Sequence, residues 1–192
     1  MGSPLLYRIL IRGTKLQKNL FKMKTLLSWR KGVFSNTTTI FEKNKSVGFI
    51  RSSDFSFSRT STAEIYGRKI LFQNSGFFET ETLIIDASTN QVIGRVHYSL
   101  WGSKADIEID NEFSKWEYRN LWNTKWDIFN SRGLRISYES SLNNGWIETN
   151  KVDAMNLLSG LYVSQYYERK ISYVAVFCSF IPLLMLLTFF WR

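Results

Sequence analysis

Three acidic residues that alternate with isoleucines are the clearest candidates for catalytic or metal-binding chemistry in this sequence. Asp106, Glu108 and Asp110 are separated by Ile107 and Ile109, so in an extended strand the three carboxylates share one face at intervals of about 6.6 Å. Carboxylates at such spacing can act in glycoside hydrolysis or bind a hard cation. The same alternation is typical of the solvated face of a strand, and we favour that interpretation.

Few other groups are suited to catalysis. His97 is the single histidine and shares a strand face with Arg95 and Ser99, without a second group that could complete an acid–base pair, so we expect a surface histidine. Cys178, the single cysteine, excludes an intrachain disulfide and a four-cysteine metal site. No phosphate-binding loop, dinucleotide fingerprint, nucleophile elbow or zinc-protease motif occurs. We therefore predict no enzyme, no cofactor and no bound metal.

A cluster of large aromatic residues has the composition of a surface that stacks bases or sugars. Acidic and basic neighbours offset one another along this stretch, so no electrostatic funnel for nucleic acid results. We predict that these rings pack a barrel or form a hydrophobic rim. The residues are Trp116, Tyr118, Trp122, Trp126 and Phe129.

The elements that must position these groups have a period of two residues. Between about residues 37 and 150, short runs alternate apolar with polar residues, as in Val92–Leu100, Ala105–Asp110 and Leu134–Glu139. Asn, Ser and Gly separate the runs every eight to twelve residues or so. The pattern predicts about ten to twelve strands, arranged as a sandwich or a closed barrel. Two stretches, 40–50 and 84–96, resemble each other and predict two similar hairpins, in which Gly48 and Gly94 permit a bulge or sharp bend.

The strands are followed by a segment that predicts a buried helix. Asp153 is a good N-cap, and the run Ala154–Tyr167 has no charge and is apolar on nearly every face. A helix without a charged face is expected inside other structure. We predict a central helix over 154–168, whose core residues are Leu157, Leu158, Leu161 and Val163.

The last segment, 171–191, has 21 residues without a charge. As a helix it would be about 32 Å long, which is enough to cross the hydrocarbon core of a bilayer. The alternative is that this segment, and not 154–168, is the buried helix. We favour a transmembrane helix with flanking charges, interfacial aromatic rings and a tolerated proline. The predicted membrane-anchoring residues are Arg169, Lys170, Tyr173, Pro182, Trp191 and Arg192.

The N-terminal residues 1–36 form a basic arm. Eight of the 25 Lys and Arg residues lie in residues 1–31, which have no Asp or Glu, and the rest of the chain is nearly neutral with 17 basic and 16 acidic groups. Basic residues interspersed with leucine and isoleucine are typical of an amphipathic helix on an anionic membrane, or of a mitochondrial targeting segment. A third interpretation is that the natural chain starts at Met23.

The order of these elements resembles the tubby C-terminal-like superfamily, which includes the LURP-one-related proteins and the phospholipid scramblases. The resemblance covers residues 37–168 and includes a hairpin that looks like the family's recurrent one, formed by Ile84, Ile85, Asp86, Gln91, Val92, Ile93 and Gly94. It implies a closed twelve-stranded antiparallel barrel threaded by a hydrophobic helix. Tubby proteins bind phosphoinositides. The acidic calcium-binding segment and cysteine cluster of scramblases have no counterpart in this sequence.

These observations predict a membrane-anchored, non-enzymatic barrel with three parts: the arm 1–36, the barrel 37–168 and the transmembrane helix 171–191. The expected partners are membrane lipids, including anionic ones, and not nucleic acid. The basic residues before the tail favour a cytoplasmic location for the bulk of the chain. The alternative is a lipocalin-like barrel that carries a small hydrophobic ligand, which requires that Ala154–Tyr167 leave the lumen empty.

Overall fold

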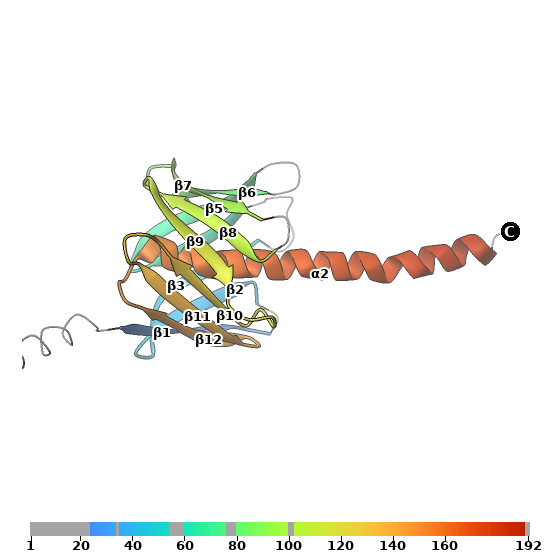
Figure 1. The fold of residues 1–192 in the computed structure, drawn as a ribbon, viewed down its shortest axis with the longest axis horizontal. Coiled ribbons are helices and arrows are strands. Elements are labelled where there is room, and N and C mark those ends of the chain that lie inside the picture. Colours follow the sequence, from blue (N-terminus) through green and yellow to red (C-terminus); the bar gives the residue numbers. More distant parts are fainter. Residues whose placement is uncertain (1–23, 34, 54–59, 76–79, 100–101, 191–192) are drawn as a thin grey trace, which may run out of the picture.

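The fold is a closed barrel of twelve antiparallel strands with one long helix (Figure 1). The computed structural model describes residues 24–33, 35–53, 60–75, 80–99 and 102–190, with side chains placed up to residue 172. The strands are β1 (Thr25–Lys31), β2 (Thr37–Glu42), β3 (Lys45–Ser52), β4 (Thr60–Ile65), β5 (Arg68–Ser75), β6 (Glu81–Asp86), β7 (Gln91–Tyr98), β8 (Lys104–Ile109), β9 (Glu112–Tyr118), β10 (Lys125–Phe129), β11 (Arg135–Ser141) and β12 (Asn144–Thr149), and the helix is α2 (Ala154–Phe190).

Each strand pairs with its neighbours in sequence, and β1 closes the barrel by pairing with β12. The inward residues of the strands are buried and mostly apolar, whereas the outward ones are mostly polar, as the period of two requires. The predicted mainly β class and the closed antiparallel barrel are therefore confirmed.

The barrel begins earlier than the sequence predicted, because β1 lies inside the segment assigned to the N-terminal arm. Leu27 and Trp29 point into the core and are buried, while Leu26 and Arg30 are exposed on the outer face. The boundary at residue 36 was wrong. In β1, Arg30 lies on the outer face and Lys31 ends the strand. With only two inward apolar residues, the period of two is hard to distinguish from that of an amphipathic helix.

The two similar hairpins predicted from the sequence are β2–β3 and β6–β7. Each has an irregularity in its register opposite the glycine, between Ile40 and Phe41 in the first and between Ile84 and Ile85 in the second. A Cβ atom at Gly48 or at Gly94 would lie closer than 3.0 Å to a backbone carbonyl oxygen of the next strand. The glycines are therefore required by the close approach of two backbones, and the predicted bulges are confirmed.

Helix α2 starts where the sequence predicted and continues further. The Asp153 carboxylate accepts a hydrogen bond of 3.0 Å from the backbone N–H of Asn156, which caps the first turn. The helix then runs without interruption to Phe190. The predicted division at Glu168–Lys170 was wrong, because Glu, Arg and Lys are good helix formers and neither glycine nor proline lies between Leu161 and Ile181.

The barrel wall surrounds the first part of α2. The inward side chains of strands far apart in the sheet contact this part, including Phe72 of β5, which stacks on Tyr162 at 4.1 Å between ring centroids, and Tyr98 of β7, which stacks on Tyr166 at 3.7 Å. On another side, Gln165 Nε2 donates a hydrogen bond of 2.9 Å to Thr38 Oγ1 of β2.

The predicted transmembrane segment 171–191 lies mostly outside the residues whose side chains are described. Within the described part of the chain, no helix is both long enough and apolar enough to span a bilayer. Of the predicted anchoring residues, Arg169 and Lys170 lie in the described part of α2. The side chains of Tyr173, Cys178 and Pro182 are not among those described, and Trp191 and Arg192 lie outside the described residues. The transmembrane helix therefore stays a prediction.

Candidate functional site

The predicted core residues of the helix are all buried. Leu157, Leu158 and Val163 have no exposed surface, and Leu161 is 1% exposed. They are buried together with Tyr162, Ser164 and most of the neighbouring helix surface. This arrangement places side chains where a lipocalin-like barrel would hold its ligand.

Side chains of three adjacent strands bind the helix backbone at two neighbouring carbonyl groups, those of Gly160 and Leu157. Trp116 Nε1 of β9 and Trp126 Nε1 of β10 each donate a hydrogen bond of 3.1 Å to the Gly160 carbonyl oxygen. Tyr138 Oη of β11 donates one of 3.0 Å to the Leu157 carbonyl oxygen. Burial raises the pKa of the Tyr138 hydroxyl well above its usual value, as expected for a phenol enclosed by the barrel.

Of the aromatic residues predicted to pack the barrel or form its rim, some are buried in the core and others are exposed at the barrel end. Trp116 and Trp126 are buried, and Tyr118 packs edge-on against Trp116 at 4.6 Å between centroids. Trp122 is 85% exposed in the loop between β9 and β10. Phe129 is half-buried at the end of β10.

The acidic strand and the histidine lie side by side on the outer face of β7 and β8. Asp106 is exposed, Glu108 is half-buried, and Asp110 lies in the turn after β8 with a φ of 50°. Asp106 is opposite His97 of β7 in the sheet register, and the half-exposed His97 Nε2 lies 3.7 Å from Glu81 Oε1. These groups form an outer face on which charges of both signs alternate, as we favoured for the carboxylates.

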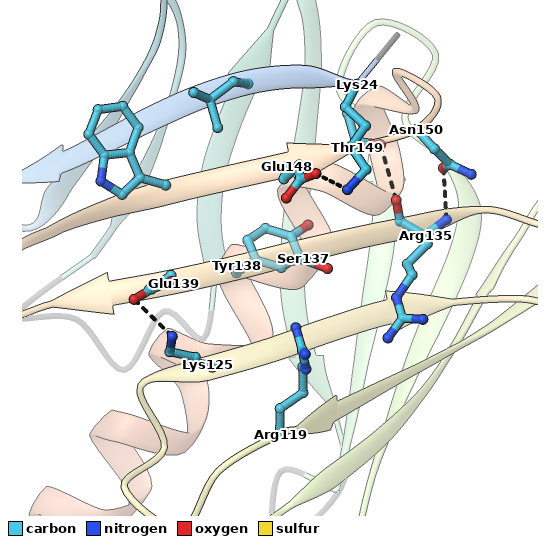
Figure 2. A pocket seen from close by; sticks show the side chains of 12 residues that line it. Lys24, Arg119, Lys125, Arg135, Ser137, Tyr138, Glu139, Glu148, Thr149 and Asn150 are labelled. Atoms are coloured by element: carbon cyan, nitrogen blue, oxygen red, sulfur yellow. Dashed lines mark hydrogen bonds and ion pairs between the residues drawn. The ribbon is translucent and has the colours of Figure 1, made fainter. Parts of the chain in front are cut away.

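The strongest candidate site is a groove on the outer wall that the sequence did not predict (Figure 2). It has a volume of about 900 Å³ and crosses strands β10, β11, β12 and β1. We call it the basic groove. The lining residues whose side chains point outward or lie at its ends are Lys24, Leu26, Arg119, Lys125, Arg135, Ser137, Glu139, Trp146, Glu148 and Asn150.

The short side chain of Ser137 forms the middle of the basic groove. In the sheet register Ser137 lies between Asp127 of β10 and Glu148 of β12, and longer side chains stand around this row. Trp146 and Leu26, each 57% exposed, provide apolar surface on the side of β12 and β1. The wall is therefore concave because one outward position is small and its neighbours are large.

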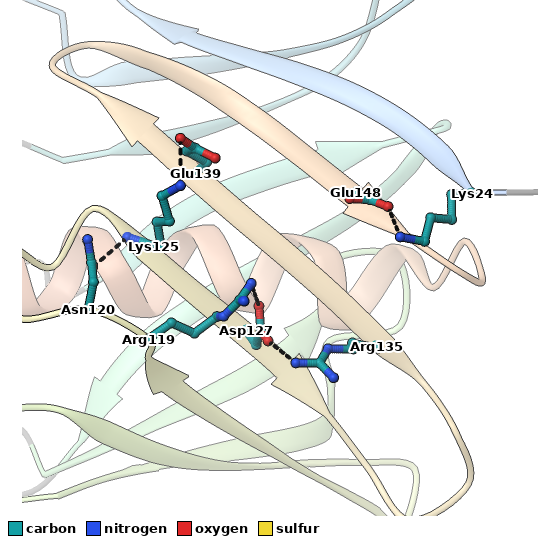
Figure 3. A network of polar contacts seen from close by, with 8 residues as sticks. All are labelled: Lys24, Arg119, Asn120, Lys125, Asp127, Arg135, Glu139 and Glu148. Carbon is teal, nitrogen blue, oxygen red and sulfur yellow. Dashed lines mark hydrogen bonds and ion pairs between the residues drawn. The ribbon is translucent and has the colours of Figure 1, made fainter.

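Beneath the basic groove, a buried carboxylate holds two arginines (Figure 3). Asp127 points outward from β10, but its side chain is only 3% exposed. Its Oδ2 lies 2.7 Å from Arg135 Nη2 and its Oδ1 lies 3.5 Å from Arg119 Nη1. A buried carboxylate is costly unless it is paired and hydrogen-bonded, and the two guanidinium groups meet that requirement.

At these two arginines, the basic groove has more positive than negative charge. Lys24 is paired with Glu148, and Lys125 Nζ lies 3.1 Å from Glu139 Oε1. Each lysine thus has a carboxylate of its own, whereas Arg119 and Arg135 share one. Their side chains remain 50% and 63% exposed, so N–H donors face the solvent. An oxyanion such as a phosphate or carboxylate suits this arrangement.

Sequence reasoning missed the basic groove because its residues come together only through the strand register. Arg119 and Arg135 each lie eight residues from Asp127, on either side of it. That spacing, around an acidic residue with apolar neighbours on both sides, is the one local signal. Comparison of the chain with known protein families, with curated proteins and with solved structures finds no match.

Proposed function

We propose that this protein is a membrane-anchored, non-enzymatic barrel of the tubby-like kind, whose basic groove binds the phosphate of an anionic phospholipid headgroup. The observation that carries the proposal is the pair Arg119 and Arg135, held on the single carboxylate of Asp127 with N–H donors open to solvent. Arginine is suited to phosphate because its planar donors can bind two oxygens at once. Trp146 and Leu26 provide apolar surface for the part of the lipid next to the phosphate.

The closed twelve-stranded barrel and its helix are consistent with the superfamily that the sequence resembles. They also weigh against the second candidate, a carrier of a hydrophobic ligand. The space that such a carrier needs is occupied by Leu157, Leu161, Tyr162 and their neighbours. The proposed ligand therefore binds outside the barrel.

Replacing both groove arginines together with the carboxylate that they share, as Arg119→Gln, Arg135→Gln and Asp127→Asn, should weaken binding to anionic vesicles tenfold or more without leaving an unpaired charge buried at Asp127. Each charge-assisted hydrogen bond contributes about 1.5–3 kcal/mol, and tenfold corresponds to about 1.4 kcal/mol. The measurement is co-sedimentation of residues 24–170 with phosphatidylcholine vesicles that contain or lack phosphatidylserine. This fragment keeps β1 and omits both the basic arm and the tail.

The matched control is Arg51→Gln, which removes an exposed cation on β3, outside the basic groove. It should leave binding nearly unchanged. Competition by soluble glycerophosphate would show that the headgroup alone is recognised. Equal binding to neutral vesicles, or equal loss in the Arg51→Gln variant, would contradict the proposed function.

We also expect the full-length chain to fractionate with membranes and a chain ending at Lys170 to be soluble and folded. The motive is the 21-residue uncharged segment beyond a barrel whose helical core ends at Tyr167. Differential centrifugation and far-UV circular dichroism measure the two properties. Aggregation of the shortened chain would show that the tail is needed by the barrel itself.

A further inference from the structure

The two ends of the barrel differ in polarity. Helix α2 enters at the end where β12 finishes and leaves at the end where β8 starts, near Lys104 (Figure 1). We call these the entry end and the exit end. At the exit end, four large apolar side chains stand on loop tips: Val33 (77% exposed), Leu121 (98%), Trp122 (85%) and Leu142 (95%). We call these four residues the exit rim.

The entry end has no comparable surface in the described residues. Its turns are formed largely by Asn, Asp, Ser, Thr, Lys and Gly, as in Lys43–Asn44, Ser88–Asn90 and Asp110–Asn111. In the turns at this end, the exposed large apolar residues are Val152 and Tyr66, each less than half exposed. Phe113 (67% exposed), Leu26 (57%) and Val92 (50%) are near this end but lie within strands, on the outer wall and not on loop tips. The asymmetry therefore belongs to one end of the molecule and is not a general property of its loops.

The loop that presents Leu121 and Trp122 is held by its own hydrogen bonds. Asn120 Oδ1 accepts hydrogen bonds of 3.0 Å from the backbone N–H of Thr124 and of Lys125. Asn120 Nδ2 donates another of 2.7 Å to Thr124 Oγ1. The polar residues close the loop, so its two apolar residues are directed away from the barrel.

Leu142 occupies a position that turn geometry alone does not favour. It has a φ of 55°, in the left-handed region that bulky residues rarely adopt and where asparagine or glycine is usual. Next to it, the carbonyl oxygen of Asn143 accepts a hydrogen bond of 2.7 Å from the backbone N–H of Lys31. This bond brings the segment leading to Val33 beside the turn of Leu142, so the loops that carry these two residues are neighbours.

The last charged residues of the helix lie at the level of the exit rim. Tyr167 Oη donates a hydrogen bond to the carbonyl oxygen of Lys104 at the start of β8, which places Tyr167 at this end. Arg169 and Lys170 reach back toward the barrel, where their cationic groups lie 5.7 and 5.8 Å from the ring centroids of Tyr162 and Tyr166. Beyond them, Ile171 is exposed and the sequence has no charge before Arg192.

From these observations we infer that the exit end of the barrel lies against the bilayer, with Val33, Leu121, Trp122 and Leu142 inserted into the interfacial layer. This inference rests on the proposed membrane anchoring. A lipid surface fits better than a second protein because the uncharged segment leaves at the same end. Tryptophan and lysine also favour that layer, and Lys31, Lys104 and Lys125 lie at this end.

The orientation also relates the exit rim to the basic groove. The loop of Leu121 and Trp122 joins Arg119 to Lys125, both of which line the groove. Leu142 lies in the turn between Glu139 and Trp146, on the other side of it. With the exit rim in the interface, the near end of the groove would face the headgroup layer.

The test is a full-length protein reconstituted into phosphatidylcholine and phosphatidylserine vesicles, with an environment-sensitive fluorophore on a single introduced cysteine. Leu121→Cys and Leu142→Cys probe the exit rim, and Asn90→Cys, in an entry-end turn, is the matched control. Each cysteine is introduced into a Cys178→Ala background, so that only one site is labelled. If that change affects expression, Cys178 is kept and the signal of the labelled parent protein is subtracted. Vesicle flotation is measured on every sample, and lipids with a nitroxide near the headgroup serve as quencher.

We expect the probes at 121 and 142 to shift to shorter wavelength and to be quenched several-fold more than the probe at 90. Flotation with no quenching at 121 and 142 would overturn the orientation while leaving the anchoring intact. Equal quenching at all three positions would also overturn it. If the protein does not float with the vesicles, both the proposed membrane anchoring and the inferred orientation are contradicted.

Discussion

We expect Leu161→Lys to abolish folding of the barrel. Leu161 is 1% exposed in the part of α2 that the strands surround, so an ammonium group there would have no route to solvent. An unpaired buried charge costs several kcal/mol even after relaxation, and natural domains are stable by only about 5–15 kcal/mol. The milder Leu161→Ala should cost about 2–5 kcal/mol, the usual range for a core leucine. Near-UV circular dichroism and thermal unfolding distinguish these outcomes.

The same chemical change at the exit rim is the matched control. Leu121→Lys also replaces a leucine by a lysine, but at a side chain that is 98% exposed. Its effect on stability should remain within about 0.5 kcal/mol. A lysine scan from Ala154 to Tyr167 extends the comparison along the helix. Tolerance that recurs every three to four positions would show that one face of α2 is outside the barrel and would contradict the arrangement described above.

The barrel was predictable because its information is local. Alternation in runs such as Ala105–Ile109 fixes both the strand and its inward face, and the uncharged run after Asp153 indicates a helix without a solvent face. Strand β1 was missed because Leu27 and Trp29 are its only inward apolar residues, and because it lies in a segment rich in basic residues and without acidic ones. Short elements carry too few positions for their period to be determined.

The helix end and the groove were missed for different reasons. The charged residues at Glu168–Lys170 indicate a change of environment, but they do not break a helix, and α2 continues through them. The basic groove depends on which residues of β10, β11, β12 and β1 are adjacent in the closed sheet. The alternation within one strand shows which of its residues face outward, as Ser137 does. It does not show which outward residues of the neighbouring strands lie beside them.

The interior of the barrel allows a second prediction of large effect, at Gly160. In a helix, Gly→Ala normally stabilises by about 1 kcal/mol, because alanine loses less backbone entropy on folding. Here we expect the opposite sign, with Gly160→Ala destabilising the protein by about 1–3 kcal/mol or more. A Cβ atom at this position would lie closer than 3.0 Å to the hydroxyl oxygen and the ring of Tyr138. That ring is 2% exposed and is fixed by its hydrogen bond to the Leu157 carbonyl oxygen, so it cannot move aside freely.

Two comparisons isolate this contact. Ser159→Ala, at the preceding residue, removes a buried hydroxyl that has no hydrogen-bond partner among the described residues, so it should be neutral or stabilising. Tyr138→Leu should be destabilising alone, but it removes the ring that the new methyl group meets. In a double-mutant cycle, Gly160→Ala should therefore cost less in the Tyr138→Leu background than in the native protein. Additive effects in urea unfolding would mean that the methyl group is accommodated without Tyr138, and that the wall of β9, β10 and β11 does not approach the helix at Gly160 as closely as these contacts require.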